Sequence, residues 1–470
     1  MKSNYEVIIQ GGHIVLPHGV EKMDIGINEG VIVAIEPQLI PDGDTTIYDA
    51  TDLVVMPGAI DAHVHFNEPG LDSWEGFETG SASLAVGGIT TYIDMPLNGV
   101  PPTTTMRGWE MKGARAKGHS YVDYAFWGGL VQDNLEELAP LADAGAAGFK
   151  AFMSEPGGEG EEIFTRANDQ TLIKGMERIA EIGGVLALHA ESDEMTSALS
   201  YAKQSRGHVS ARDYLDSRPP EAEIEAVQRA LVYAKETGCP LHFVHISTRR
   251  AVELIQTAKI DGLDVTVETC PHYLVLTEED VLELGAIAKC APPLRNLIEQ
   301  EQLWEAIEDE QIDLIASDHS PCLPSMKETD NFFEIWGGIA GAQSTLLLML
   351  DEGYVKRGIP LTTMARLLSA NPAKRFGLAG TKGEIQIGKD ADFAIIDFNQ
   401  GYVLTEQDIR YRHPQSPYMN RSFSCRIKGT FSRGILVYND VTGLIEQKPG
   451  RFIAAGVRTT LASKGGDRYA

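Results

Sequence analysis

The sequence predicts an α/β protein built as a (β/α)8 barrel of the TIM type, with a small β-sandwich domain formed by both termini. Three observations carry this prediction. Short apolar segments alternate with amphipathic helical stretches through the middle of the chain, and β-rich blocks flank that region on both sides. The 470 residues are also enough to bury a large core.

Eight short apolar segments in the central region have the composition of strands. Amphipathic helices fill most of the gaps between them, for example over residues 172–182 and 221–237, and several end at a glycine. Such βα repeats are typical of a parallel sheet, either closed into a barrel or open and doubly wound. No glycine-rich phosphate loop follows the first strand, so the barrel is favoured. The predicted strands are residues 59–65, 90–94, 122–126, 148–152, 185–189, 241–245, 265–269 and 313–318.

The two ends of the chain look alike. Near the start, residues 6–9, 24–27 and 31–35 alternate as strands do, and Asn28-Glu29-Gly30 is typical of a hairpin turn. Strand-like segments return at residues 383–387 and 391–396. We therefore expect both ends to form one domain. The predicted limits are 1–55 and 379–458 for the β-sandwich domain, 56–378 for the barrel and 459–470 for a small, polar, disordered tail.

The composition of the chain excludes several classes of binding partner. The formal net charge of -27 argues against nucleic acid or an anionic membrane surface as the main partner. No apolar run approaches the roughly 20 residues of a membrane span, and no signal peptide precedes the first strand, so we expect a cytoplasmic protein with a small-molecule substrate. The five cysteines contain no CxxC pair, which predicts free thiols.

Polar residues that are costly to bury fall at the ends of the predicted strands. In a barrel of this type, catalytic groups come from the carboxyl ends of the strands. We therefore expect these side chains to meet in one site. They are His63 and His65 after the first strand, Lys150 in the fourth, His189 after the fifth, His245 after the sixth and Asp318 after the eighth.

The pair His63 and His65 is the most local signal for a metal. Residues i and i+2 of a strand face the same side, so both imidazoles reach one ion. Taken alone, the pair fits two half-buried histidines equally well. His189 and His245 are also, singly, typical of hydrogen-bonded structural histidines. His242 has the opposite strand parity to His245, so we expect it to lie outside the metal shell.

Lys150 lies inside an apolar run, where a lone lysine would normally snorkel or form a salt bridge. Beside four histidines and an aspartate, carbamylation becomes the better interpretation, because it converts the cation into an anionic ligand with two oxygens. Asp318 alone could cap a helix, but at the mouth of the eighth strand it is better placed as ligand and general base. Imidazole and carboxylate together predict a pair of divalent ions, zinc first, with cobalt, manganese or iron as alternatives.

These residues resemble the cyclic amidohydrolase family of dihydroorotases, dihydropyrimidinases or hydantoinases, and allantoinases. The resemblance covers nearly the whole chain. It rests on the segments Met56–His65, Glu268–Leu274, Ala316–Pro321, Asn371–Ala373 and Gly388–Asp392.

The resemblance implies a ligand set and a chemistry. It assigns His63, His65, N6-carboxylated Lys150 and Asp318 to one metal, and Lys150, His189 and His245 to the other. A hydroxide bridging the two metals would attack the ring carbonyl, while Asp318 would move its proton to the leaving nitrogen. The resemblance also implies a homotetramer.

Departures from the relatives narrow the substrate. Dihydroorotases typically carry an arginine two positions after the second histidine, where this chain has Asn67. Dihydropyrimidinases usually have a tyrosine shortly after the modified lysine, and residues 150–157 contain none. The segments Asp94–Asn98 and Ser317–Cys322 look most like allantoinases, which open the five-membered ring of allantoin to give allantoate. Another hydantoinase is the alternative, and a non-catalytic family relative is a third reading, weakened because every expected ligand position is filled.

Substrate contacts are expected from four residues. Asn98 and the backbone around Cys290 and Ala291 would meet the ring, whose amides present paired donors and acceptors, and Asn67 would meet the ureido arm. Asn98 fits a turn residue equally well. Cys322 stands where dihydroorotases have a substrate-facing histidine, although a small buried residue fits that position too.

Overall fold

The central part of the chain forms a closed parallel barrel. A computed structural model describes residues 5–157 and 162–456, so the predicted disordered tail lies outside the described residues. Neighbouring barrel strands pair in parallel from β6 through β8 and from β9 through β14. Val64 bridges His319 in parallel, and the His65 amide donates to the His319 carbonyl at 2.8 Å, which brings the last strand against the first. The strands are β6 (Ala59–Val64), β7 (Ile89–Asp94), β8 (Asp123–Phe126), β9 (Gly128–Gly129), β10 (Phe149–Phe152), β11 (Leu186–His189), β12 (Leu241–Phe243), β13 (Val265–Thr269) and β14 (Leu314–Ile315).

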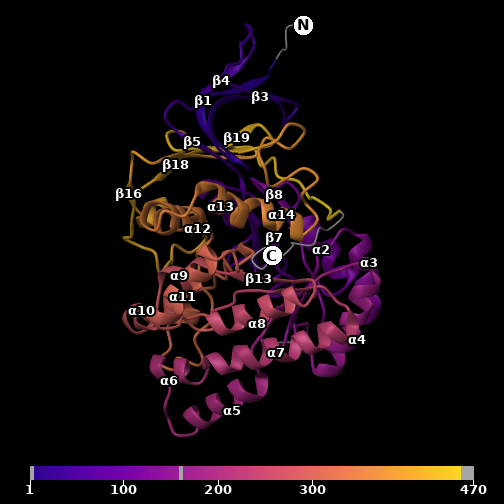
Figure 1. Ribbon diagram of the computed structural model, residues 1–470. Coiled ribbons are helices and arrows are strands. Elements are labelled where there is room, and N and C mark those ends of the chain that lie inside the picture. The colour runs from indigo at the N-terminus through magenta and orange to yellow at the C-terminus, as the bar shows by residue number, and fades with distance from the viewer. Residues whose placement is uncertain (1–4, 158–161, 457–470) are drawn as a thin grey trace, which may run out of the picture.

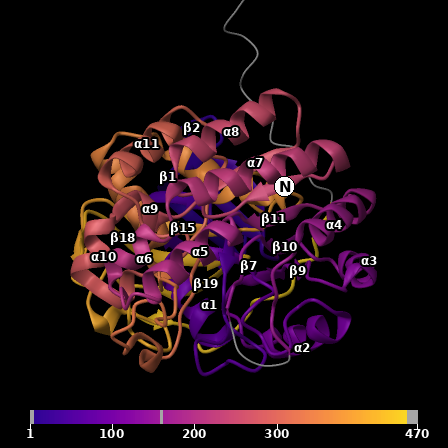
Figure 2. The ribbon, with the colours of Figure 1, turned by 90° about the horizontal axis from the view of Figure 1, so that it is seen from below.

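Helices surround these strands, and Figure 2 shows α2, α3, α4, α7, α8 and α11 following one another around the outside. Their apolar faces pack on the barrel, and α7 ends where Gly238 takes the left-handed conformation (φ 70°) that glycine adopts without strain. The main helices are α1 (Phe77–Val86), α2 (Met106–Ala116), α3 (Leu138–Asp143), α4 (Asp169–Glu181), α7 (Pro220–Thr237), α8 (Arg249–Ile260) and α11 (Leu297–Glu308). Shorter ones are α5 (Asp193–Gln204), α6 (Ala211–Asp216), α9 (Pro271–Val275), α10 (Glu278–Leu284), α12 (Thr345–Met349), α13 (Leu361–Ala365) and α14 (Asn371–Arg375).

Strands from both ends of the chain lie together at one end of the molecule, with α5 and α6 at the opposite end (Figure 1). They form one nine-stranded sheet in which β5 is the junction, since it pairs in parallel with β1 and antiparallel with β15. This sheet has its own apolar core. The strands are β1 (Val7–Leu16), β2 (Gly19–Asn28), β3 (Val31–Glu36), β4 (Thr46–Asp49), β5 (Val54–Pro57), β15 (Phe393–Asp397), β18 (Arg426–Ser432), β19 (Ile435–Asn439) and β20 (Gly443–Leu444); β16 (Tyr402–Val403) pairs separately with β17 (Ser422–Phe423).

The predicted fold class, a barrel with a β-domain from both termini, is therefore confirmed. The hairpin turn at Asn28-Glu29-Gly30 is also present, with Glu29 and Gly30 at φ 50° and 76°. The predicted strand at 383–387 is wrong. Gly383 has φ 93°, and the segment is held instead by single hydrogen bonds that Ile32 exchanges with Gly388 and Lys389. The predicted domain limits stay a prediction, and β5 spans the limit between residues 55 and 56.

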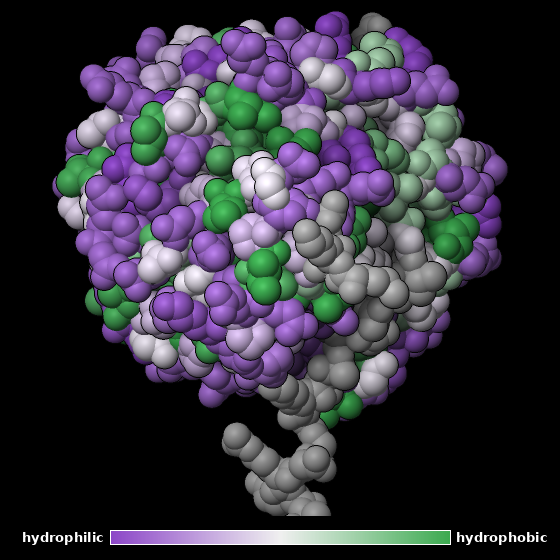
Figure 3. All heavy atoms as spheres, turned by 90° about the horizontal axis from the view of Figure 1, so that it is seen from above, coloured by the Kyte–Doolittle hydropathy of each residue, from purple (hydrophilic) through white to green (hydrophobic). Residues whose placement is uncertain are grey.

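The surface at one end of the molecule is mostly hydrophilic. Seen from the end formed by the β-domain, hydrophobic side chains occur in small groups separated by hydrophilic ones (Figure 3). Among the described residues, no helix combines the length and apolar character needed to cross a membrane.

Candidate metal centre

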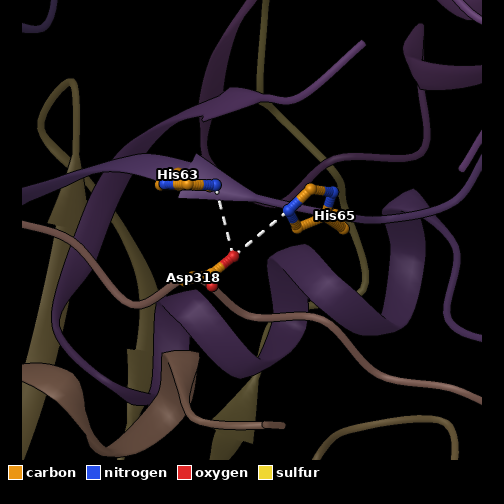
Figure 4. Close-up of side chains that lie close together, drawn as sticks. All are labelled: His63, His65 and Asp318. Carbon is orange, nitrogen blue, oxygen red and sulfur yellow. Dashed lines mark hydrogen bonds and ion pairs between the residues drawn. The ribbon is translucent and has the colours of Figure 1, made fainter. Parts of the chain in front are cut away.

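His63 and His65 leave the end of β6 and point at one carboxylate, as Figure 4 shows. The Nε2 atoms of both rings lie 3.2 Å from Asp318 Oδ1, and the three side chains offer atoms within 4.8 Å of one another. Asp318 follows β14 with φ 46°, a strained left-handed conformation that turns its side chain toward β6. The predicted HxH pair and Asp318 thus meet as expected.

A buried glutamate fixes the His63 ring. His63 Nδ1 donates to Glu268 Oε1 at 2.8 Å, which leaves Nε2 for Asp318. The other oxygen, Oε2, accepts from His242 Nε2 at 3.1 Å. Burial raises the pKa of Glu268, but the charges and hydrogen bonds of His63 and His242 outweigh it and lower the pKa to about 2. His242 therefore lies behind His63, outside the cluster, which matches its expected position.

His189 and His245 form a second pair at the same mouth of the barrel. His189 ends β11 and His245 lies two residues beyond β12 with φ 41°, so their facing atoms, Nδ1 and Nε2, are 3.0 Å apart. The His189 ring stacks on Phe152 with centroids 4.6 Å apart, and its Nε2 donates to Glu191 Oε2 at 2.8 Å. Burial lowers the pKa of His245 well below its usual range, and His189 and Lys150 lower it further.

Lys150 lies in β10 beneath both pairs and is fully buried. Its Nζ has no hydrogen-bond partner among the described residues and lies 5.0 Å from the Phe152 ring centroid. Desolvation lowers the pKa of Lys150 to about 8, opposed by the negative charges of Asp318 and Glu268. A buried amine of this kind is readily neutralised, and the barrel holds it without a salt bridge.

The arrangement fits divalent metal ions. Neighbouring ring centroids are 5.4 Å apart for His65 and His63, 5.5 Å for His63 and His245, and 4.7 Å for His245 and His189. Four imidazoles and one carboxylate are a donor set that zinc and neighbouring ions prefer. The buried Nζ of Lys150 has no partner within the described residues, as expected for a group that awaits modification or a ligand.

A cavity of about 530 Å³ opens above these groups. Of the four predicted substrate contacts, Asn98, Cys290 and Ala291 line it. Asn67 is buried and is not among the residues that line it; its Nδ2 donates to the Pro321 carbonyl at 3.2 Å, while its Oδ1 has no partner among the described residues. Cys322 is buried and is not among the residues that line this cavity.

Sequence reasoning missed several residues of the site. Glu191 and Glu268 each hold a histidine, and Arg218 lines the cavity while donating to Glu191. Glu191 carried a usable signal, since it lies two positions after His189. Glu268 carried one too, because an acid inside the apolar strand Val265–Thr269 is as unusual as Lys150. Arg218, in the loop between α6 and α7, carried none.

Comparisons with known proteins agree with this geometry. The amidohydrolase family profile matches residues 54–437. An allantoinase of Rubrobacter xylanophilus is 48% identical over 96% of this chain and 98% of its own length. An allantoinase of Bacillus velezensis is 49% identical over 93% and 94%. The solved structure of the L-hydantoinase (dihydropyrimidinase) from Arthrobacter aurescens superposes with a TM-score of 0.92 and 34% identity, covering 96% of this chain and all of that one.

Proposed function

The chain belongs to the amidohydrolase family, and we propose from this premise that it is an allantoinase, which hydrolyses the cyclic amide of allantoin to give allantoate. The observation that carries the proposal is the cluster of histidine, lysine and aspartate side chains at the floor of the cavity. The chain is also 46–49% identical to several allantoinases. Divalent ions held at the floor of a pocket would supply what hydrolysis of an unactivated amide requires.

We propose that two divalent ions, zinc first among them, bind here. His63, His65 and Asp318 would hold one, His189 and His245 the other, and N6-carboxylated Lys150 both. Such ions supply a nucleophile from water near neutral pH and polarise the scissile carbonyl. The carboxylation joins Lys150 Nζ to the carbon of CO2 with loss of one proton from nitrogen. It is supported by the buried, unpaired Nζ, whose neutral form is the nucleophile.

Asp318 is the proposed proton carrier. Burial raises the pKa of its carboxyl, but the charge of His63 and the hydrogen bond from His65 hold that pKa well below the usual range. Asp318 is therefore ionised at neutral pH. Its carboxylate can accept the proton of the attacking water and deliver it to the ring nitrogen that leaves, as general acid–base catalysis requires.

Position supports three of the four proposed substrate contacts. Asn98 and the backbone at Cys290 and Ala291 line the cavity and would hold the ring amides. The Tyr214 hydroxyl donates to the Cys290 carbonyl at 3.0 Å, which holds that loop of the cavity wall. Asn67 Oδ1 would accept from the ureido arm, since Nδ2 is already used by Pro321.

A second candidate, a hydantoinase acting on other cyclic amides, is favoured by the structural similarity to the Arthrobacter enzyme. One experiment separates the two: turnover of the zinc-loaded protein on allantoin, hydantoin, dihydrouracil and dihydroorotate, measured side by side. We expect a clear preference for allantoin. A preference for hydantoin or dihydrouracil would contradict the substrate and leave the metal chemistry standing, whereas loss of all four activities after chelation, restored by zinc, would support the metal centre.

Two finer points belong to the same proposal. Mass spectrometry of the intact zinc-loaded protein should show the added mass of CO2 on Lys150, and an unmodified ammonium in fully active protein would contradict it. We also propose a homotetramer, on the resemblance to the family, and light scattering of the purified chain tests it.

A further inference from the structure

Two buried carboxylates choose which nitrogen each histidine presents to the site. Glu268 accepts a hydrogen bond from Nδ1–H of His63, so that His63 presents Nε2 to the site. Glu191 accepts a hydrogen bond from Nε2–H of His189, so that His189 presents Nδ1 toward His245. A carboxylate accepts and does not donate when ionised, so each contact fixes both the tautomer and the ring orientation.

Glu191 is itself held by an arginine of the cavity wall. Arg218 Nη1 donates to the same Oε2 atom that His189 contacts, at 2.5 Å, and Glu191 is fully buried. The Arg218 guanidinium also lies over the Tyr214 ring, 5.6 Å from its centroid. Tyr214 in turn holds the Cys290 carbonyl. Through these contacts, Arg218 links His189 to the backbone at Cys290, which we propose contacts the substrate.

The Arg218 main chain is anchored as well. Its carbonyl accepts from Arg295 Nη1 at 2.6 Å, and Arg295 Nε donates to Ser247 Oγ at 3.0 Å. Ser247 and Thr248 both donate to a second fully buried carboxylate, Glu223. Glu223 shares the burial of Glu191 and belongs to the same network, but its hydrogen bonds go to hydroxyls and an amide and to no histidine.

We propose that Glu191 and Arg218 are positioning residues for His189: Glu191 holds Nε2–H, Arg218 holds Glu191, and Nδ1 is thereby presented to a metal ion. This inference rests on the proposed function, because it takes His189 as a ligand. It adds Arg218, a residue of the cavity wall that donates a hydrogen bond to Glu191.

The test uses the full chain loaded with cobalt(II), whose visible absorption reports the coordination of each ion. Bound cobalt per chain, its affinity by chelator competition and its spectrum are measured for wild type, Glu191→Ala, Glu191→Gln and Glu223→Gln. We expect Glu191→Ala to weaken one of the two ions about 10- to 100-fold and to change its spectrum. Glu191→Gln keeps an acceptor for Nε2–H and should show a smaller loss, so it serves also if the alanine variant does not fold.

Glu223→Gln is the matched control, since it alters an equally buried carboxylate of the same network without touching a histidine. We expect it to leave both affinities and the spectrum as in wild type. An equal loss in Glu223→Gln would mean that the network acts only on the fold, and wild-type cobalt binding in Glu191→Ala would overturn the inference directly.

His189→Ala separates this inference from the proposed function. If His189→Ala loses one ion while Glu191→Ala keeps both, only the positioning role fails. If His189→Ala keeps both ions with wild-type affinity, His189 is not a ligand, and the proposed ligand set fails with it.

Discussion

The two halves of the metal centre differ in what the fold supplies. Around β6, the Asp318 carboxylate already lies 3.2 Å from a nitrogen of both His63 and His65, so each of these rings has an acidic partner in place. Around β10 to β12, the Lys150 ammonium has no hydrogen-bond partner within the described residues, and its Nζ lies over the face of the Phe152 ring. The first half leaves one ring nitrogen, His65 Nδ1, without a partner among the described residues, whereas the second half leaves a buried ammonium without one, which costs far more.

This difference shows that one residue of the candidate metal centre lowers the stability of the fold. The buried ammonium of Lys150 forms no ion pair with a carboxylate, and a buried charge without such a partner destabilises the folded chain.

Lys150→Met should have the largest effect on activity and the opposite effect on stability. Removing the shared ligand should lower turnover on allantoin at least about 10³-fold, because several kcal/mol of transition-state stabilisation are lost. The metal-free variant should be as stable as metal-free wild type or more so, since it no longer buries an unpaired ammonium. Turnover, bound zinc and urea unfolding measure the three quantities.

Lys112→Met is the matched control for this prediction. Lys112 is equally buried, but its Nζ lies 2.5 Å from Asp94 Oδ2 and 2.6 Å from the Met95 carbonyl. Its loss leaves Asp94 unpaired and should destabilise the chain by about 3–5 kcal/mol. If both variants were destabilised alike, the contrast between a paired and an unpaired buried lysine would not hold.

Asp318→Asn tests the half of the metal centre around β6. The amide cannot accept the proton of the attacking water, so kcat should fall about 10²- to 10⁴-fold while the ion at His189 and His245 stays bound. Pre-steady-state turnover together with metal analysis distinguishes these effects. Near-normal kcat with both ions present would rule out Asp318 as the proton carrier.

The two halves of the metal centre should lose a similar amount of unfolding free energy at acid pH, through Glu191 in one and Glu268 in the other. Burial raises the pKa of both Glu191 and Glu268, but Arg218 and His189 beside the first, and His63 and His242 beside the second, outweigh it and lower each pKa from 4.5 to about 2. A depressed pKa stabilises the fold above pH 4.5, and that contribution, about 3 kcal/mol for each residue, is lost as the pH falls toward 2. In metal-free protein, Glu191→Gln and Glu268→Gln should each flatten the decline in unfolding free energy below pH 4.5. A decline as steep as that of wild type would contradict the assigned charges.

The smallest effects concern the substrate. Asn98→Ala should raise KM about tenfold for allantoin and hydantoin alike, since one hydrogen bond to the ring is lost. Asn67→Ala should raise KM for allantoin by a smaller factor and leave hydantoin, which has no ureido arm, unchanged. A shift for both substrates would place Asn67 at the ring or show that its bond to Pro321 shapes the cavity.

The sequence predicted most of the site because strand geometry is periodic. His63 and His65 share a side of β6, and the expected order of eight strands placed Lys150, His189, His245 and Asp318 at one mouth. The parity argument for His245 was less sound, since β12 ends at Phe243 and a left-handed φ aims that ring. A backbone turn of this kind depends on tertiary contacts and leaves no periodic signal.

Residues that reach the site from loops could not be predicted. Arg218 contacts Glu191 across 27 positions of sequence, and Tyr214 contacts Cys290 across 76. Such pairs depend on how the βα loops fold over the barrel mouth. The strand predicted at 383–387 failed for a related reason, because Ile385 is buried in the apolar core of the β-domain by side-chain packing while its backbone forms no ladder.

The junction at β5 also orders events during synthesis. Its antiparallel partner β15 begins at Phe393, so the whole barrel must leave the ribosome before β5 can complete its pairing. At about 5–20 residues per second, that delay is on the order of 15 to 70 seconds. During this interval one edge of β5 is open to strands of other chains, and crowding on a polysome would favour such pairing. The yield of folded enzyme should therefore depend on translation rate and on chaperones that shield the N-terminal strands.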